Sequence, residues 1–262
     1  MDTGEGPALS IEEKRHVAET AVGVASGRVK VLAGVMGSTT QDAVSLAKMY
    51  REIGVDGLVV FPNPAFRNFP LDPRIPICYH QAIAEESGLP IVLFQLASVF
   101  GGVVFLEEVL NALLKLPQVI GLKEASFDAQ IYSNTAAIVK TIEKPISLMT
   151  GNDTFIFESI LLGAQGGLLG FGAIGCQIVA SLLADVARGD LKKAFDTNQK
   201  AKALMQVIYQ NPVLDYRARC KVALAHIGVI PKALTYVRPP LLQITGEESE
   251  QIKAALDDSG MF

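Results

Sequence analysis

The feature that most constrains the fold is a regular alternation of short apolar runs with longer amphipathic ones. The apolar runs are rich in Val, Ile and Leu, recur at intervals of roughly 30 residues and predict strands. Uninterrupted apolar strands are typical of a parallel sheet whose two faces are both covered. The predicted strands are Lys30–Gly34, Gly57–Phe61, Ile91–Leu96, Val119–Lys123, Ile146–Thr150 and Gly167–Gly170.

Helical patterns separate these strands and then continue alone to the end of the chain. A capping box, Ser10-Ile11-Glu12-Glu13, predicts a first helix through about Ala25. The helices expected between strands are Gln41–Ile53, Ile75–Ser87, Leu106–Leu116, Tyr132–Thr141 and Thr154–Leu162. The helices expected after the last strand are Ile178–Arg188, Leu191–Tyr209, Leu214–Ile227 and Glu247–Ala255.

Repeated strand–helix units followed by helices predict a TIM-type (β/α)8 barrel with a C-terminal helical extension. Six visible strands are two short of eight, so we expect an N-terminal segment of the barrel to be missing. A single barrel fills about 200 to 250 residues, and the 262 residues are therefore expected to form one domain. Residues 1–175 would form the partial barrel, and residues 176–262 its final helix and the extension.

Charge and composition narrow the class of partner. The net charge of −4 disfavours nucleic acid and anionic membranes, which attract clustered Lys and Arg, and favours a small-molecule ligand. No secretory signal pattern is visible at the start, and the three cysteines are unevenly spaced. We therefore expect a cytoplasmic location.

An uncharged stretch between Glu158 and Asp185 is long enough to cross a bilayer as a helix. It contains two glutamines and a glycine-dense segment, Gly163–Gly175, which disfavour a membrane helix. A buried strand, a glycine-rich turn and a core helix fit these residues better.

Lys123, in the segment VIGLKEAS, is the strongest chemical candidate. It ends an apolar strand, which in a barrel places its amine at the catalytic rim. Val119, Gly121 and Lys123 share one face of that strand. If this face points inward, burial lowers the pKa of the amine, and the neutral amine can attack a carbonyl. The alternative is a lysine that extends its ammonium into solvent.

A second motif, Gly170-Phe171-Gly172-Ala173-Ile174-Gly175, matches the GxGxxG dinucleotide fingerprint, with Asp190 further on. That fingerprint belongs to a βαβ unit, and no strand is predicted after this helix. NAD binding is therefore disfavoured. The alternative is a backbone that passes close to a bound ligand near the last barrel strands.

Other polar motifs favour structural roles. Cys78-Tyr79-His80 lacks a second ligand pair for zinc, so we expect a packed cysteine and a half-exposed histidine. Gly151-Asn152-Asp153 follows a strand, and a helix-capping role is favoured over a catalytic one. His16 and His226 lie in helical patterns with no nucleophile motif nearby.

Taken together, these segments resemble the dihydrodipicolinate synthase and N-acetylneuraminate lyase group of pyruvate-type class I aldolases. The segment Gly121–Ala125, GLKEA, resembles the family's sixth strand, which carries the Schiff-base lysine, and Thr3-Gly4-Glu5 resembles the end of its second. The other matching segments are Val31–Gly34, Gly57–Pro62, Ile91–Gln95, Thr150–Asp153 and Leu162–Leu169. The resemblance implies a barrel without its first strand and most of its second.

The resemblance also implies roles for single residues. Lys123 would be the catalytic nucleophile, Thr3 would bind the substrate carboxylate, and Gly151 and Leu168 would line the pocket. Phe94 stands where the family has a tyrosine that relays protons. Two further departures are Asp2, in place of the first of two threonines that hold the substrate carboxylate, and Val99, in place of an arginine that binds the second substrate.

The resemblance implies neither a metal nor an organic cofactor, and a homo-oligomer, typically a tetramer. We expect a Schiff-base lyase or aldolase acting on a pyruvate-type 2-oxo acid, and not a true dihydrodipicolinate synthase. One alternative is a non-catalytic paralogue that serves as a binding or assembly module, which Asp2 and Phe94 favour. Another is a Schiff-base dehydratase of a sugar acid, which would use the same lysine.

Overall fold

A six-stranded parallel sheet forms the centre of the computed structural model, which describes residues 1–67 and 71–262. The strands follow one another across the sheet in chain order. They are β1 (Leu32–Val35), β2 (Gly57–Val60), β3 (Ile91–Leu96), β4 (Val119–Ala125), β5 (Ser147–Thr150) and β6 (Gly166–Gly167). The predicted parallel α/β arrangement is confirmed; that a first strand and most of a second are missing stays a prediction.

The last strand is shorter than predicted. The sequence suggests Gly167–Gly170, but only Gly166 and Gly167 pair with β5. Beyond this point Leu168 donates its amide to the Thr150 carbonyl, and the chain turns across the ends of the strands. Leu168 and Leu169, the apolar residues that predict a longer strand, instead lie in the connection between β6 and the next helix.

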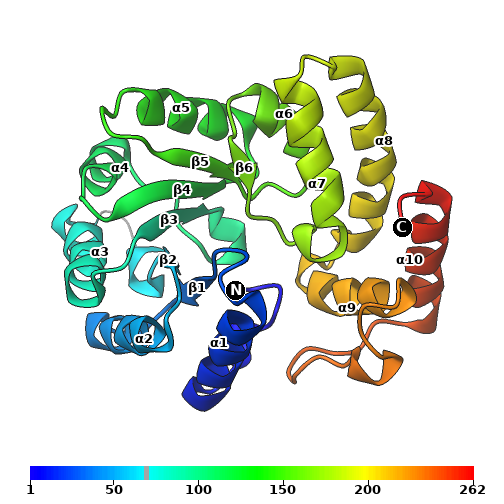
Figure 1. Ribbon diagram of the computed structural model, residues 1–262, viewed down its shortest axis with the longest axis horizontal. Helices are drawn as coiled ribbons and strands as arrows, with labels where there is room; N and C mark the ends of the chain where they lie inside the picture. The colour runs from blue at the N-terminus through cyan, green and yellow to red at the C-terminus, as the bar shows by residue number, and fades with distance from the viewer. Residues whose placement is uncertain (68–70) are drawn as a thin grey trace.

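Five helices follow the first five strands in turn and lie along the outside of the sheet (Figure 1). They are α2 (Thr40–Ile53), α3 (Arg74–Ser87), α4 (Glu107–Leu114), α5 (Ala129–Lys140) and α6 (Ile156–Leu161). Helix α1 (Ile11–Ala25) precedes β1, and the predicted capping box is present because Ser10 and Glu13 bond reciprocally. Helix α5 begins earlier than the predicted Tyr132, because the Asp128 carboxylate caps the amides of Gln130 and Ile131.

Four helices follow β6 and lie at the other side of the molecule (Figure 1), and their division into a final barrel helix and a C-terminal extension stays a prediction. They are α7 (Gly172–Ala187), α8 (Leu191–Ile208), α9 (Tyr216–His226) and α10 (Gly246–Ser259). Helix α7 begins at Gly172 instead of the predicted Ile178, with a kink at Gly175 (φ −133°, ψ 49°). Within the described residues, no helix is both long and apolar enough to cross a membrane.

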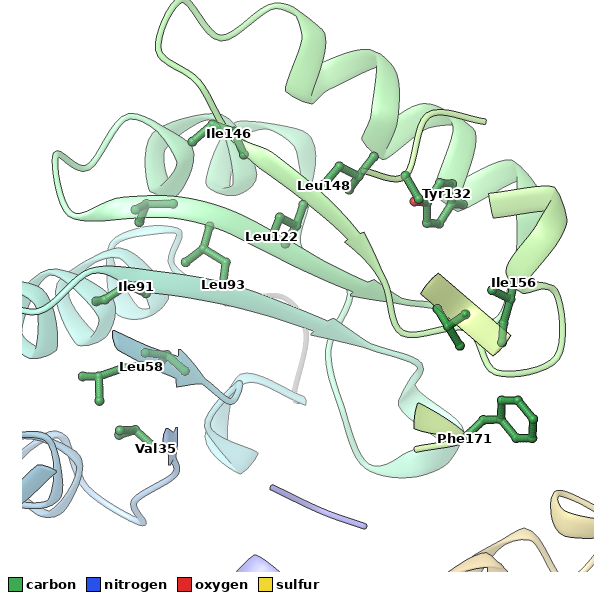
Figure 2. Close-up of a cluster of buried hydrophobic side chains, with 14 of the residues drawn as sticks. Val35, Leu58, Ile91, Leu93, Leu122, Tyr132, Ile146, Leu148, Ile156 and Phe171 are labelled. Atoms are coloured by element: carbon green, nitrogen blue, oxygen red, sulfur yellow. The ribbon is translucent and has the colours of Figure 1, made fainter. Parts of the chain in front are cut away.

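Residues alternate between two hydrophobic layers. Side chains on the outer face of the sheet, such as Leu93, Leu122 and Leu148, pack under the helices in the main core (Figure 2). Phe61, Phe94 and Ala125, on the opposite face, form a smaller cluster inside the curve of the sheet. The period of two along β4 therefore places Lys123 on the inner side with Ala125, as predicted.

The prediction for Cys78 and His80 is wrong in both parts. Cys78 is exposed, whereas His80 is completely buried. His80 contacts the Pro76 carbonyl through Nδ1 at 2.7 Å and packs against the Phe66 and Phe105 rings. Residues two apart on a helix face nearly opposite ways, so α3 buries one of them and exposes the other.

Candidate active site

A cavity of about 400 Å³ opens at the carboxyl ends of the strands. This is the end at which parallel α/β barrels carry their active sites. The N-terminal segment, the loops after β2 to β6, and the junction between α8 and α9 all contribute to its wall. The five residues that the sequence predicts for the site all line this cavity, namely Thr3, Phe94, Lys123, Gly151 and Leu168.

The Lys123 amine lies inside the cavity, against an aromatic ring. Parallel pairing sets Lys123 opposite Phe94 on β3, and the lysine Nζ lies 4.1 Å from the centre of that ring. Burial lowers the pKa of Lys123 to about 8, against the opposing effect of the Asp153 and Asp2 carboxylates. A usable fraction of the amine is therefore neutral near physiological pH.

Gly151 makes room for the lysine. A Cβ atom at this position would lie 2.5 Å from the Lys123 Cε and 2.8 Å from the Ala125 Cβ, closer than atoms can pack. The Gly151 amide donates to the Glu124 carbonyl at 2.6 Å and so fixes this loop to β4. Any residue with a side chain at position 151 would displace Lys123 from its present position.

Asp153 is a buried carboxylate in the cavity wall that sequence reasoning assigned to a helix cap. That prediction is wrong, because α6 begins at Ile156 and no side chain in the described part of the chain caps it. Instead Asp153 accepts hydrogen bonds from the amides of Phe171, at 2.8 Å, and Gly170, at 3.4 Å. Burial raises its pKa, while the Phe171 amide and the Lys123 charge act in the opposite direction.

Asn152, beside Asp153, holds the loops together behind Lys123. Its Oδ1 accepts the Phe127 amide at 2.7 Å, and its Nδ2 donates to the Glu124 carboxylate at 2.8 Å. Glu124 lies on the outer side of β4, where burial raises its pKa. These bonds tie the turn after β5 to the strand that carries the lysine.

The GxGxxG segment does not present its first amides to a dinucleotide. The amides of Gly170 and Phe171 are bonded to the chain's own Asp153, and no strand follows α7 in the described residues. Gly170 itself lines the cavity, in agreement with the alternative of a close backbone approach. A Cβ there would lie 2.5 Å from the Tyr209 Oη and 3.1 Å from the Thr3 Oγ1.

Sequence reasoning missed a polar cluster contributed by the C-terminal extension. The Tyr216 hydroxyl donates to the Asp2 carboxylate at 2.5 Å, and the Arg217 guanidinium pairs with the same oxygen at 2.6 Å. The Tyr209 ring stacks on the Tyr216 ring, with centres 5.4 Å apart. Tyr209 and Tyr216 line the cavity far along the chain from Lys123, and no local motif marks them.

The loop after β3 contains Val99 and Phe100, which point to different surroundings. Val99, at the place of the family's arginine, is 84% exposed and points to solvent. Phe100, next to it, lines the cavity and packs on Phe127, with ring centres 4.9 Å apart. A cation is supplied from another loop, since Arg67 also lines the cavity beside Gly101.

The chain is similar to known proteins over nearly its whole length. The dihydrodipicolinate synthetase family matches residues 2–259. A 4-hydroxy-tetrahydrodipicolinate synthase of Syntrophus aciditrophicus is 29% identical over 99% of this chain and 85% of that protein. One of Rickettsia bellii is 30% identical over 96% of this chain and 81% of that protein.

Solved structures show the same fold. A prophage protein of the dihydrodipicolinic acid synthase family from E. coli K12, solved with pyruvate, superposes with a TM-score of 0.89 at 23% identity. The match covers all of this chain and 86% of that one. A monomeric dihydrodipicolinate synthase variant superposes with a TM-score of 0.88 at 23% identity, over all of this chain and 84% of that one.

Proposed function

Because the chain belongs to the dihydrodipicolinate synthetase family, whose members are class I lysine Schiff-base lyases, we propose that it acts on a pyruvate-type 2-oxo acid. The observation that carries this proposal is the position of Lys123 in the cavity, with a pKa lowered to about 8 by burial. A neutral amine enclosed with a small organic acid is the arrangement that imine formation needs.

In this reaction the Lys123 amine attacks the keto carbon, and loss of water leaves an iminium. The iminium then accepts the electron pair released when a carbon–carbon bond breaks, or supplies an enamine that condenses with an aldehyde. A related dehydratase of a sugar acid would begin with the same covalent step. Lys123 is therefore the residue common to these outcomes.

The substrate carboxylate would bind close to Thr3, with the backbone at Gly151 and Leu168 beside it. All three line the cavity with Lys123. Asp2, the departure from the family pattern, is paired with Arg217 and Tyr216, which offsets its charge near the incoming acid. The Thr3 hydroxyl is then the side-chain donor that we assign to the carboxylate.

The true dihydrodipicolinate synthase reaction is not the activity that we propose. Phe94 supplies no hydroxyl beside Lys123, and Val99, at the place of the family's arginine, is exposed, so the cavity has a cation from Arg67 on another loop instead. Both departures also favour the alternative of a non-catalytic binding or assembly module, which the retained lysine opposes. The tetramer stays a prediction, since one similar structure is described as a monomeric variant.

The proposal is tested by trapping the imine. Borohydride reduction with pyruvate present, followed by peptide mass mapping, is expected to place one adduct on Lys123. Lys192 is the internal comparison, because it is exposed and paired with Asp196. Adducts spread over surface lysines, or none at Lys123 across several 2-oxo acids, would exclude the lyase and leave the binding module.

The pH dependence of trapping is a separate prediction. The ammonium form of Lys123 cannot attack, so the initial rate is expected to rise with pH through about 8 and then level off. A solvated lysine would rise near its ordinary pKa of about 10.4. Asp153 and Asp2 both raise the pKa of Lys123, so Asp153→Asn is expected to move the midpoint to lower pH. Initial rates of pyruvate labelling between pH 6 and 10 measure the midpoint for the parent chain and for Asp153→Asn. A midpoint near pH 10 in both proteins would contradict the assignment.

A further inference from the structure

The Tyr209 hydroxyl is a buried polar group beside the Asp153 carboxylate, and the described residues give it no well-formed hydrogen bond. It lies in the wall of the cavity that contains Lys123. A buried hydroxyl without a well-formed hydrogen bond lowers the stability of the fold. A role in the chemistry of the cavity would explain its presence. The Tyr132 hydroxyl also lacks a partner among the described residues, but Tyr132 does not line this cavity.

The surroundings of Tyr209 place its hydroxyl beside Gly170 and Asp153 in the cavity wall. Gly170 has no side chain, so the Tyr209 Oη can lie close to the backbone at this position. The amides of Gly170 and Phe171 there donate to Asp153. Stacking on Tyr216, whose own hydroxyl is bonded to Asp2, fixes the ring. Burial and the neighbouring Asp153 carboxylate raise the pKa of Tyr209, so the phenol keeps its proton until a stronger base takes it.

The chemistry at Lys123 needs such a group. Imine formation moves protons between the amine, the substrate oxygen and the departing water, and a positioned acid–base group accelerates these transfers. Phe94, whose ring lies against the Lys123 Nζ, has no proton to move. Asp153 is the buried acid of this wall, and its carboxylate is held by two amides.

We propose that Tyr209 carries protons between Lys123 and the substrate oxygen, with Asp153 as the group that stores the proton. This inference rests on the proposed function and adds to it a catalytic residue from the C-terminal extension. Tyr209 would contact the substrate oxygen directly.

The proposed steps need no proton donor or acceptor other than Lys123, Tyr209 and Asp153. Asp153 takes one proton from the Lys123 ammonium, and the neutral amine forms a bond to the keto carbon while the carbonyl electron pair moves to oxygen. Tyr209 donates its proton to that oxygen and is restored by a proton from the new nitrogen centre. The hydroxyl then leaves as water with the proton stored on Asp153, relayed through Tyr209, and the nitrogen becomes the iminium.

The test compares three variants in the full chain. Tyr209→Phe removes only the hydroxyl and is expected to slow borohydride-trappable imine formation with pyruvate by about 10²- to 10⁴-fold. The final extent of labelling at saturating pyruvate should be unchanged, because a proton carrier alters the rate and not the equilibrium. Tyr132→Phe removes an equally buried, unpaired hydroxyl from the core under α5 and should leave the rate as in the parent (Figure 2).

Phe94→Tyr, made in the Tyr209→Phe background, supplies a hydroxyl beside the Lys123 Nζ and should restore part of the rate. Restoration by a residue on β3 would not follow if Tyr209→Phe had merely disturbed α8. A parental labelling rate in Tyr209→Phe overturns the inference, as does a slow Tyr209→Phe that Phe94→Tyr does not accelerate. Absence of any Lys123 adduct in the parent chain overturns the proposed function instead.

Discussion

Replacing Lys123 by methionine is expected to abolish the pyruvate adduct and any lyase activity while the chain stays folded. Methionine keeps an unbranched apolar stem of similar length but has no amine, so no imine can form. Removal of a covalent nucleophile lowers rates by several orders of magnitude in enzymes that use one. Because burial disfavours the Lys123 ammonium, its removal should not destabilise the fold.

Mass mapping after borohydride reduction measures this loss, and urea unfolding checks that the variant is folded. Lys192→Met is the matched control, since it removes an exposed amine and its ion pair with Asp196. It should leave the adduct at Lys123 intact. Undiminished activity in Lys123→Met would contradict every Schiff-base mechanism for this chain.

Replacing Arg219 by alanine is expected to lower the free energy of unfolding by about 2–4 kcal/mol, because several buried acceptors lose a charged hydrogen-bond donor. Arg219 is completely buried and pairs with Glu248 at 3.0 Å. Its guanidinium also donates to the carbonyls of Ile208, Gln210 and Pro212, which form the junction between α8 and α9. Without it, all three carbonyls and the Glu248 Oε1 lose a charged donor, although Pro212 keeps the Asp215 amide and Glu248 keeps Thr245.

Urea unfolding monitored by circular dichroism measures this change. The matched control is Arg15→Ala, because Arg15 forms an exposed pair with Glu19 on α1 at 3.9 Å. Such surface pairs contribute about 0–1 kcal/mol. Equal effects of the two substitutions would show that the junction does not depend on Arg219. Since Tyr209 and Tyr216 flank this junction, Arg219 also supports the cavity wall.

The local signals in the sequence determined the frame of the fold. Continuous apolar runs predict β2, β3 and β4. A strand of a parallel sheet that is covered on both faces needs apolar residues along its length, and this requirement does not depend on which segments cover it. The Ser10 capping box predicts the start of α1, because its donors and acceptors lie within four residues. Lys123 could also be identified, since the period of two on β4 sets its face and strand ends define the site of a barrel.

What only the tertiary structure decided concerns contacts between distant segments. Asp153 follows a strand as a helix cap would, but the Gly170 and Phe171 amides reach it after α6 and β6 have folded back. His80 is buried because Phe66 and Phe105 close over one face of α3. Tyr209 and Tyr216 reach the cavity of Lys123 because α8 and α9 pack on α7 and α10, which places their junction in the cavity wall. Periodicity and helix caps depend only on residues that are close in the sequence. The burial and the pKa of a side chain depend on which distant segment packs over it.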